Sequence, residues 1–440
     1  MLLATMAAWQ QWLFKTKEGA ELVERALFHE IQHYTAQYLE ALAHQVRELK
    51  TAEDCFILQK ELLGILFRVE QIEDGCTKLL RTGSADLDIR AKQFAAGRGA
   101  RQLRTVGDAL AWMVLGGNRR AVIALLQNEQ PGRIHGKGER GLQAEMNVVN
   151  ACWHRDGHFA LLHDSTNILR IDDGTVCNRL HRTDVKKGHD GCPEADYGLF
   201  EVKANRRAKP SPEQKLRHQA ALAAINEGAD IKTKAGLRRQ FQWQDGYDSH
   251  QDQLSKVLDR AMSDGHGAAQ LEEGWVISAV RFVSTDAADS GKSIEDIVDP
   301  WQEMQDQLVA KAGFAGRPQL KVHSGDAAGR LLKCLPYALF PMSERAYAFL
   351  TSDWLVMSSV LSLDYLEARL QAAGVKTERI DDSKGTIRLS SGDHAITTSR
   401  SSIEDILLEG ITIDTWAKAM AAWAAEPGFE GQGELVLDLR

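Results

Sequence analysis

The 440-residue chain has few cysteines, no long hydrophobic run and no excess of basic residues. Six cysteines without a regular spacing exclude a disulfide scaffold, and we expect a reducing, cytoplasmic environment. No window reaches the roughly 18 consecutive apolar residues of a membrane span, so no membrane partner is expected. The apolar residues 1–14 have no basic residues ahead of them and are expected to form a helix rather than a signal peptide. A net charge of −8 excludes a wholly basic nucleic-acid coat protein, but it leaves room for a local basic patch.

The sequence also lacks a Walker-type nucleotide-binding motif and the nucleophile motif of serine hydrolases. The chain contains neither a Walker-type G-x-x-x-x-G-K-[ST] sequence nor a G-x-S-x-G elbow. Residues 136–141 fit G-x-G-x-x-G, but no good strand precedes them, as a dinucleotide site would require. These glycines are therefore expected to form a flexible segment that leads into the following helix.

The length predicts two or three domains, and the first, residues 1–130, reads as helical. Apolar residues recur there every three or four positions, which is typical of a helix with one buried face. The first stripe is Leu27, Ile31, Tyr34, Tyr38, Leu42, Val46 and Leu49. The second is Leu58, Leu62, Leu66, Val69 and Ile72, and a third helical stretch covers 106–127 with a break at Gly116-Gly117. We expect this domain to act as a scaffold, to bind a partner protein or to form a homo-oligomer.

The pattern changes at Pro131-Gly132, where α/β segments begin. For a second domain, residues 131–290, we predict helices at 142–153, 212–226 and 251–262 and strands at 159–162, 167–171, 199–204 and 275–283. For a third, residues 291–440, we predict an α/β accessory module with helices at 294–312, 364–373, 402–408 and 413–425 and strands at 386–389 and 434–437. No fixed-period repeat is present.

The most informative segment is residues 193–204, PEADYGLFEVKA. Alternate side chains of a strand share a face, so Glu201 and Lys203 would lie side by side with Asp196 just upstream. Two carboxylates can hold Mg²⁺ through oxygen ligands, and an ammonium group can orient a water molecule or neutralise phosphoryl charge. Hydrolysis of a phosphodiester needs all of these parts.

This segment resembles the PD-(D/E)XK nuclease superfamily, whose members have the restriction-endonuclease-like fold. It is most similar to the compact Asp…Glu-x-Lys block of the mismatch-repair nicking endonuclease and related restriction enzymes. The resemblance implies that Asp196 and Glu201 bind Mg²⁺ or Mn²⁺, that Lys203 is the catalytic lysine and that Glu145, from the preceding helix, is a further ligand. Glu145 falls on one helical stripe with Leu142 and Val149, where a charge needs a partner such as a metal.

The first carboxylate has alternatives. Only four residues separate Asp196 from Glu201, and an unbroken strand would point the two side chains in opposite directions. Asp196 can therefore lie beside Glu201 only if the chain makes a turn or bulge at Gly198. Without that turn, the first ligand would be Asp190 or Asp172.

Basic residues follow the Glu-x-Lys strand. Residues 201–240 contain ten Lys or Arg against four acids, which favours contact with a phosphate backbone. The candidate nucleic-acid contacts are Arg206, Arg207, Lys209, Lys215 and Arg217. Phe241, Trp243 and Tyr247 could stack on bases, but an ordinary core role is preferred for them.

Two cysteines and two histidines precede the motif. Cys177, His181, His189 and Cys192 form C-x3-H-x7-H-x2-C, a known zinc ligand set with a spacing that matches no common finger. These four residues would either bind a structural zinc ion or be loop residues without a special role.

Together these features predict a multidomain protein with an α-helical N-terminal domain, a central α/β restriction-endonuclease-like domain with a mixed sheet, and a C-terminal α/β module. The expected function is a metal-dependent nuclease acting on DNA, and by analogy with the resembled enzymes it would serve bacterial restriction or anti-phage defence. The alternative is a catalytically inactive protein that keeps the fold for nucleic-acid binding or assembly.

Overall fold

The computed structural model describes most of the chain. The described residues are 17–83, 86–126, 134, 138–169, 171–181, 197–202, 211–227, 231–233, 236–243, 246, 248–282, 294–324, 335–381, 386–391, 394–398, 400–426 and 433–437. In this part the helices are α2 (Lys17–Leu27), α3 (Glu30–Glu48), α4 (Ala52–Arg81), α5 (Leu87–Val114), α6 (Arg119–Leu125), α7 (Gly138–Ala151), α8 (Pro212–Glu227), α9 (Gln251–Asp264), α10 (Ile294–Lys311), α12 (Glu344–Thr351), α13 (Leu363–Ala372), α14 (Arg400–Glu409) and α15 (Ile413–Ala424).

The described strands form four small sheets. In sheet order they are β1 (His158–Leu162), β2 (Gly174–His181) and β3 (Tyr197–Phe200); β13 (Gly433–Leu437), β5 (Gly236–Trp243) and β4 (Ile231–Thr233); β6 (His266–Glu272), β7 (Trp275–Arg281), β9 (Leu355–Ser362) and β8 (Gln319–His323); and β10 (Lys376–Asp381), β11 (Thr386–Ser391) and β12 (His394–Thr397). All neighbours are antiparallel except β13 and β5, which run parallel. The protein is therefore mixed α/β with a helical N-terminal region.

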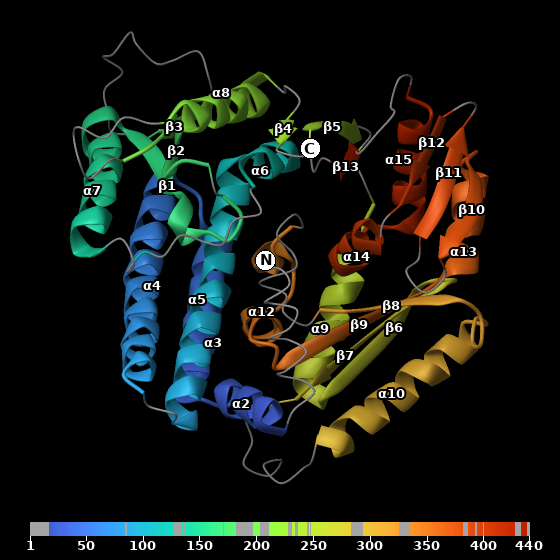
Figure 1. Ribbon diagram of the computed structural model, residues 1–440. Coiled ribbons are helices and arrows are strands. Elements are labelled where there is room, and N and C mark those ends of the chain that lie inside the picture. The colour runs from blue at the N-terminus through green and yellow to red at the C-terminus, as the bar shows by residue number, and fades with distance from the viewer. Residues whose placement is uncertain are drawn as a thin grey trace.

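The N-terminal helices form one layer, in which α5 packs on α2, α3 and α4 (Figure 1). The predicted apolar stripe of α4 is confirmed, because Leu58, Leu62 and Leu66 are fully buried. Helix α5 ends at Val114, where Gly116 and Gly117 adopt positive φ, so the predicted break is confirmed as well.

The predicted stripe over residues 27–49 is partly wrong. Tyr34 is 59% exposed and Tyr38 is 37% exposed, whereas Thr35 and Leu39 are buried. Helix α2 ends at Leu27 and α3 begins at Glu30, so no single helix spans the region. The buried face of α3 includes the polar Thr35, which a search for apolar spacing passes over.

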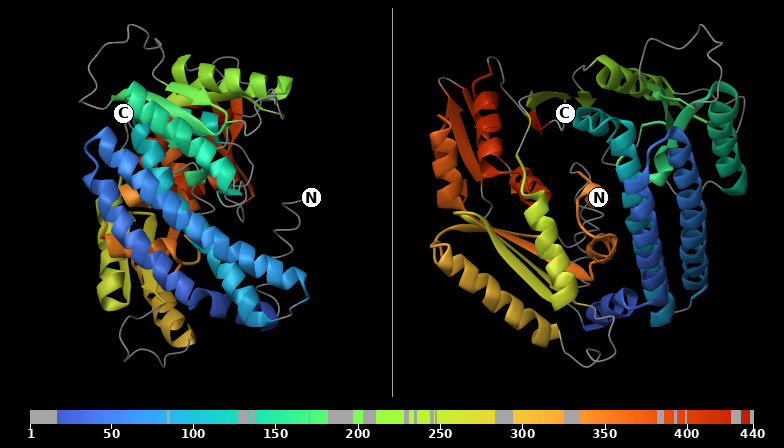
Figure 2. Two further views of the ribbon diagram at one scale, coloured as in Figure 1. Left: turned by 90° about the vertical axis from the view of Figure 1, so that its left-hand side faces the viewer. Right: turned by 180° about the vertical axis from the view of Figure 1, so that it is seen from behind.

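The β1–β2–β3 sheet is flanked in the chain by α7 and α8 (Figure 2). The strand predicted at 167–171 is wrong. Asp108 of α5 accepts the backbone N–H groups of Asn167 at 2.6 Å and Ile168 at 3.1 Å, so a side chain takes the place of a strand partner for these groups. The strand that pairs with β1 is β2, which the sequence did not indicate.

The expected domain boundary at residue 290 runs through a sheet. Strand β7 lies before it and pairs over its whole length with β9, which lies after it. The parallel pairing of β13 with β5 joins the C-terminal segment to the chain before residue 290 in the same way. Strand pairing joins residues that are distant in the sequence, so the composition near residue 290 does not indicate that a sheet crosses this boundary.

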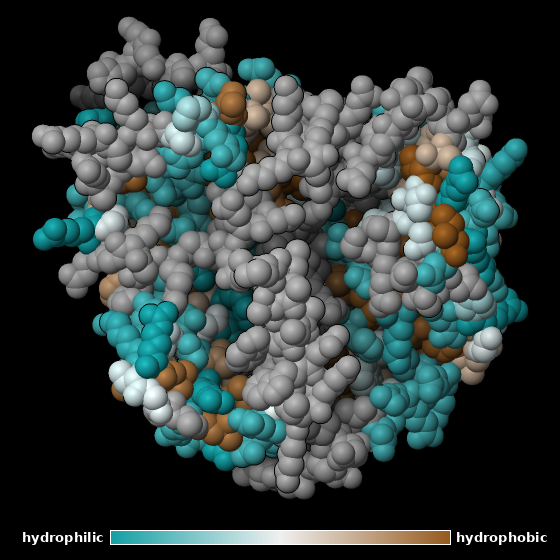
Figure 3. Space-filling view, viewed as in Figure 1, coloured by the Kyte–Doolittle hydropathy of each residue, from teal (hydrophilic) through white to brown (hydrophobic). Residues whose placement is uncertain are grey.

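The surface seen in Figure 3 is mainly hydrophilic where it is described, with small scattered groups of hydrophobic residues. None of the described helices combines the length and the apolar character that a membrane span requires.

Candidate active site

The end of the β2–β3 hairpin carries the acidic residues of the candidate site. Gly174 pairs with Phe200 and Val176 with Gly198, in a regular antiparallel register. The turn or bulge expected at Gly198 is therefore wrong. Gly174 has a structural role instead, because a Cβ atom there would lie 2.2 Å from Cζ of Phe200.

Asp173 extends this pairing by one step. Its backbone N–H donates to the carbonyl of Phe200 at 3.0 Å, and its Oδ2 accepts the backbone N–H of Val202 at 2.6 Å. The segment that carries Glu201 is thereby held against the segment that carries Asp172, although the two are far apart in the chain.

Asp172 lies close enough to Glu201 for the two negative charges to interact. Its side chain is only 8% exposed, and it adopts a φ of 63°, a left-handed conformation that Asp tolerates better than most residues. Burial raises the pKa of the Asp172 carboxyl, and the nearby Glu201 and Asp173 carboxylates add to this rise against the lowering effect of His218. Of the three alternatives for the first carboxylate, Asp172 is the one that lies within the described residues, and its charge interacts with that of Glu201.

Helix α8 contacts both carboxylates. Nδ1 of His218 pairs with Oδ2 of Asp172, and Nε2 of Gln214 donates to Oε1 of Glu201 at 3.1 Å. Sequence reasoning missed Asp173, Gln214 and His218. An Asp-Asp-Gly turn before a strand and a Gln-x3-His pair on the helix that follows Glu201 are the signals that could have found them.

Glu145 lies on α7 and is 4% exposed, with Val149 fully buried on the same helix. The prediction that this carboxylate faces inward is confirmed. Within the described residues, however, no three His, Cys, Asp or Glu side chains stand close enough together to hold one metal ion.

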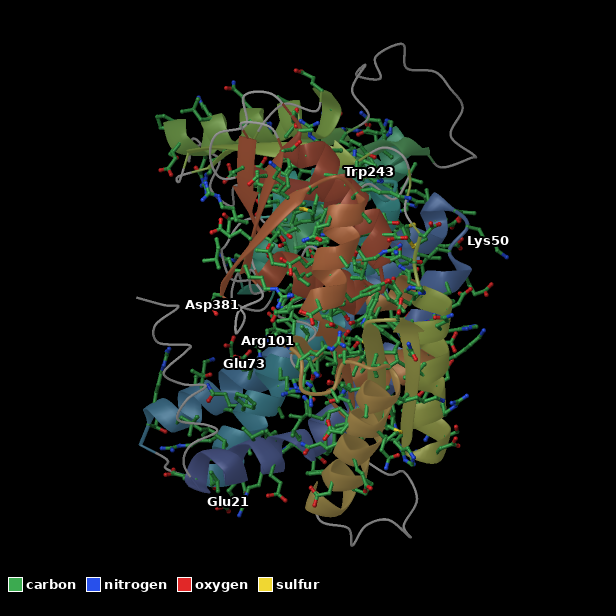
Figure 4. The ribbon with its side chains drawn as sticks, turned by 90° about the vertical axis from the view of Figure 1, so that its right-hand side faces the viewer. Glu21, Lys50, Glu73, Arg101, Trp243 and Asp381 are labelled. Atoms are coloured by element: carbon green, nitrogen blue, oxygen red, sulfur yellow. The ribbon has the colours of Figure 1, made fainter. Side chains whose placement is uncertain are left out.

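The other predicted residues divide into two groups. Lys215 is exposed and Arg217 is half-buried, both on α8. Outside the described residues lie Asp190, Asp196, Lys203, Arg206, Arg207 and Lys209. Trp243, at the end of β5 (Figure 4), donates from its indole nitrogen to the carbonyl of Gly246 at 2.8 Å, a local packing role.

Cys177 of the zinc alternative lies in the middle of β2, not in a loop. It is fully buried, and burial together with the neighbouring Cys55 raises the pKa of its thiol. Zinc binds the thiolate, so this core position opposes metal binding. The side chain of His181 and all of His189 and Cys192 fall outside the described residues.

The chain matches no protein-family model, and comparison with curated proteins and with solved structures found no similar chain.

Proposed function

We propose that the protein is a metal-dependent nuclease that hydrolyses phosphodiester bonds in DNA. The observation that carries this proposal is the pairing of the segment that carries Asp172 with the segment that carries Glu201, through the hydrogen bonds of Asp173 to Phe200 and Val202. In the sequence, Glu201 is followed two residues later by Lys203. Carboxylate oxygens are the ligands that Mg²⁺ and Mn²⁺ prefer. Burial is the main cause of the raised pKa of Asp172, with smaller contributions from Glu201 and Asp173, and a bound cation would offset the cost of ionising this buried carboxyl.

Some of the site residues would bind the metal ion or the DNA, and others would take part in the reaction. Asp172 and Glu201 would bind the cation. Glu145 on α7 is the further ligand that the resemblance implies, but in the described structure it does not form one three-ligand group with that pair. A bound Mg²⁺ or Mn²⁺ ion would polarise the scissile phosphate. Lys203 would orient the attacking water and neutralise charge that develops on the phosphate. Lys215 and Arg217 would contact the phosphate backbone together with Arg206, Arg207 and Lys209.

Asp190 and Asp196 stay competing assignments for the first ligand, since both lie outside the described residues. The restriction-endonuclease-like fold, a role in restriction or anti-phage defence, a cytoplasmic location and a partner or homo-oligomer bound through the N-terminal helices are parts of the same proposal.

The test is cleavage of supercoiled plasmid and of single-stranded DNA in Mg²⁺ or Mn²⁺, with EDTA as the metal-free control. We expect Asp172→Asn, Glu201→Gln and Lys203→Ala each to lower cleavage by roughly 100-fold or more. Glu227→Gln is the matched control, because Glu227 is an exposed carboxylate at the far end of α8, and it should cleave like the wild type. An Asp196→Asn variant that loses cleavage while Asp172→Asn retains it would reverse the assignment.

A second candidate is a catalytically inactive nucleic-acid-binding or assembly protein with the same fold. The observation that favours it is that no three ligand side chains converge within the described residues. Binding of DNA without cleavage in Mg²⁺, Mn²⁺ or Co²⁺ would select this candidate.

A further inference from the structure

Helix α8 is fixed against β3 at both of its ends. Near its C-terminus, the Asn226 side chain accepts the backbone N–H of Tyr197 and donates to the carbonyl of the same residue, both at 3.1 Å. Near its N-terminus, Gln214 donates to Glu201. The helix therefore runs antiparallel to β3 and braces the strand from its first residue to the end that carries Glu201.

The amide of Gln214 is oriented before any ligand binds. Its Oε1 accepts the backbone N–H of Ser211 at 2.9 Å, and the Ser211 hydroxyl accepts the backbone N–H of Gln214 at 3.1 Å. This reciprocal pair is a capping box, and Pro212 occupies the first helical position, where its fixed φ suits a helix start. Because the amide oxygen is engaged by the cap, the amide nitrogen is directed to Glu201.

His218 lies one helical turn after Gln214, so the two side chains share a face of α8. The imidazole is about one-third exposed, whereas the Asp172 side chain that it contacts is nearly buried. A single rigid helix thus occupies one oxygen of each carboxylate in the pair.

We propose that Gln214 and His218 are positioning residues that set the orientation of Glu201 and Asp172 for cation binding. This inference rests on the proposed metal-dependent function. Hydrogen bonds from α8 hold Oε1 of Glu201 and Oδ2 of Asp172, so the cation would bind through the other oxygen of each carboxylate. Groups that orient metal ligands in this way typically change metal affinity by 10–100-fold when they are removed.

The test measures Mn²⁺ affinity by isothermal titration calorimetry and the rise in Tm on adding Mn²⁺, alongside plasmid cleavage. We expect Gln214→Ala and His218→Ala each to weaken Mn²⁺ binding by about 10–100-fold. His218→Asn should restore most of the affinity, because the Asn amide nitrogen can take the place of Nδ1. Gln219→Ala is the matched control, since Gln219 is exposed on the same helix, and it should bind Mn²⁺ like the wild type.

The outcomes separate this inference from the proposed function. Wild-type protein that neither binds Mn²⁺ nor cleaves DNA would refute both. Wild-type protein that binds and cleaves, with Gln214→Ala and His218→Ala binding Mn²⁺ equally well, would overturn the positioning role alone. A third outcome would also overturn the positioning role. In it, the alanine variants lose both Mn²⁺ affinity and metal-free Tm, and His218→Asn restores neither the affinity nor the Tm.

Discussion

Gln59 on α4 pairs with Ala160 in β1 much as a residue of a neighbouring strand would. Its Nε2 donates to the carbonyl of Ala160 at 2.9 Å, while its Oε1 accepts the backbone N–H of Leu162 at 2.8 Å. The Gln59 side chain is fully buried. The helical region therefore covers the β1 edge of the sheet that carries the candidate site.

Removing this amide should destabilise the protein. Gln59→Ala leaves a buried carbonyl and a buried N–H group of β1 without partners, at a cost of roughly 2–5 kcal/mol in the free energy of unfolding. Urea titration measures the loss. Gln45→Ala, which removes an exposed amide on α3, should stay within about 0.5 kcal/mol of the wild type. Equal stability of the two variants would contradict the edge-covering role.

Two helical glycines should respond in opposite directions to alanine. A Cβ atom at Gly107 of α5 would lie 1.9 Å from the carbonyl oxygen of Ser165, so Gly107→Ala must displace backbone. We expect a loss of roughly 2–4 kcal/mol. Gly64 of α4 has no atom within 4 Å of the same position, so Gly64→Ala should gain about 0.5–1 kcal/mol of helix stability. Thermal unfolding of both variants tests the close approach of α5 to residue 165.

A buried ion pair ties α6 to α14. Arg119 donates to both oxygens of Glu409 at 2.7 Å, and the N–H of Leu335 also donates to Glu409. Arg119→Met leaves the carboxylate buried without its cation and should cost about 3–5 kcal/mol. The exposed pair of Arg388 and Glu378 is the control, and Arg388→Met should change stability by less than about 1 kcal/mol.

The double variant refines this prediction. Replacing Arg119 and Glu409 together by Met should cost less than the two single replacements added, because no uncompensated charge remains buried. Additive losses in urea titrations would show that the two side chains act independently.

Acid should weaken the contacts around Glu272. Burial raises the pKa of this carboxyl, but hydrogen bonds from His250, the N–H of Ile413 and Tyr365 outweigh burial and hold the pKa below its ordinary value of 4.5. Ionised Glu272 therefore stabilises the fold above about pH 4.5, and this stabilisation is lost as the pH falls through the lower pKa of the folded state.

Glu272→Gln should accordingly have a lower Tm at neutral pH and a shallower fall in Tm between roughly pH 5 and pH 3. Glu273→Gln is the control, because Glu273 is the exposed neighbour in the same turn. If Glu272→Gln keeps the wild-type slope, the lowered pKa is not a source of stability.

Glu145 can be tested apart from the hairpin. Glu145→Gln keeps the size of the side chain, and we expect a fall in cleavage of roughly 100-fold and a smaller rise in Tm on adding Mn²⁺, measured from the variant's own metal-free Tm. Gln143→Ala, an exposed change on the same helix, should behave like the wild type. A Glu145→Gln variant with full cleavage would remove Glu145 from the site.

Elements that depend on interactions between residues close in the sequence were predicted better than elements that depend on long-range pairing. Helices α8, α9, α10, α13 and α15 were predicted close to their observed bounds, since apolar spacing and helix-start residues act within a few positions. Asp172 was one of the alternatives that the sequence offered, but strand β2 and its pairing with β3 were not predicted, because this pairing joins segments that lie about 25 residues apart. Tyr34 and Tyr38 fit an apolar spacing, but tertiary packing buried polar Thr35 on α3 instead.

By itself the amino-acid sequence determined a helical first region, an α/β remainder and the acidic and basic residues of a Glu-x-Lys segment. Those features depend on residue types and on spacing within one element. Only the tertiary structure showed that one helix, α8, holds both Asp172 and Glu201, because strand register and the packing of α8 bring together atoms that are distant in the chain. It also decided that one sheet spans residue 290, for the same reason: strand partners are selected by the whole fold.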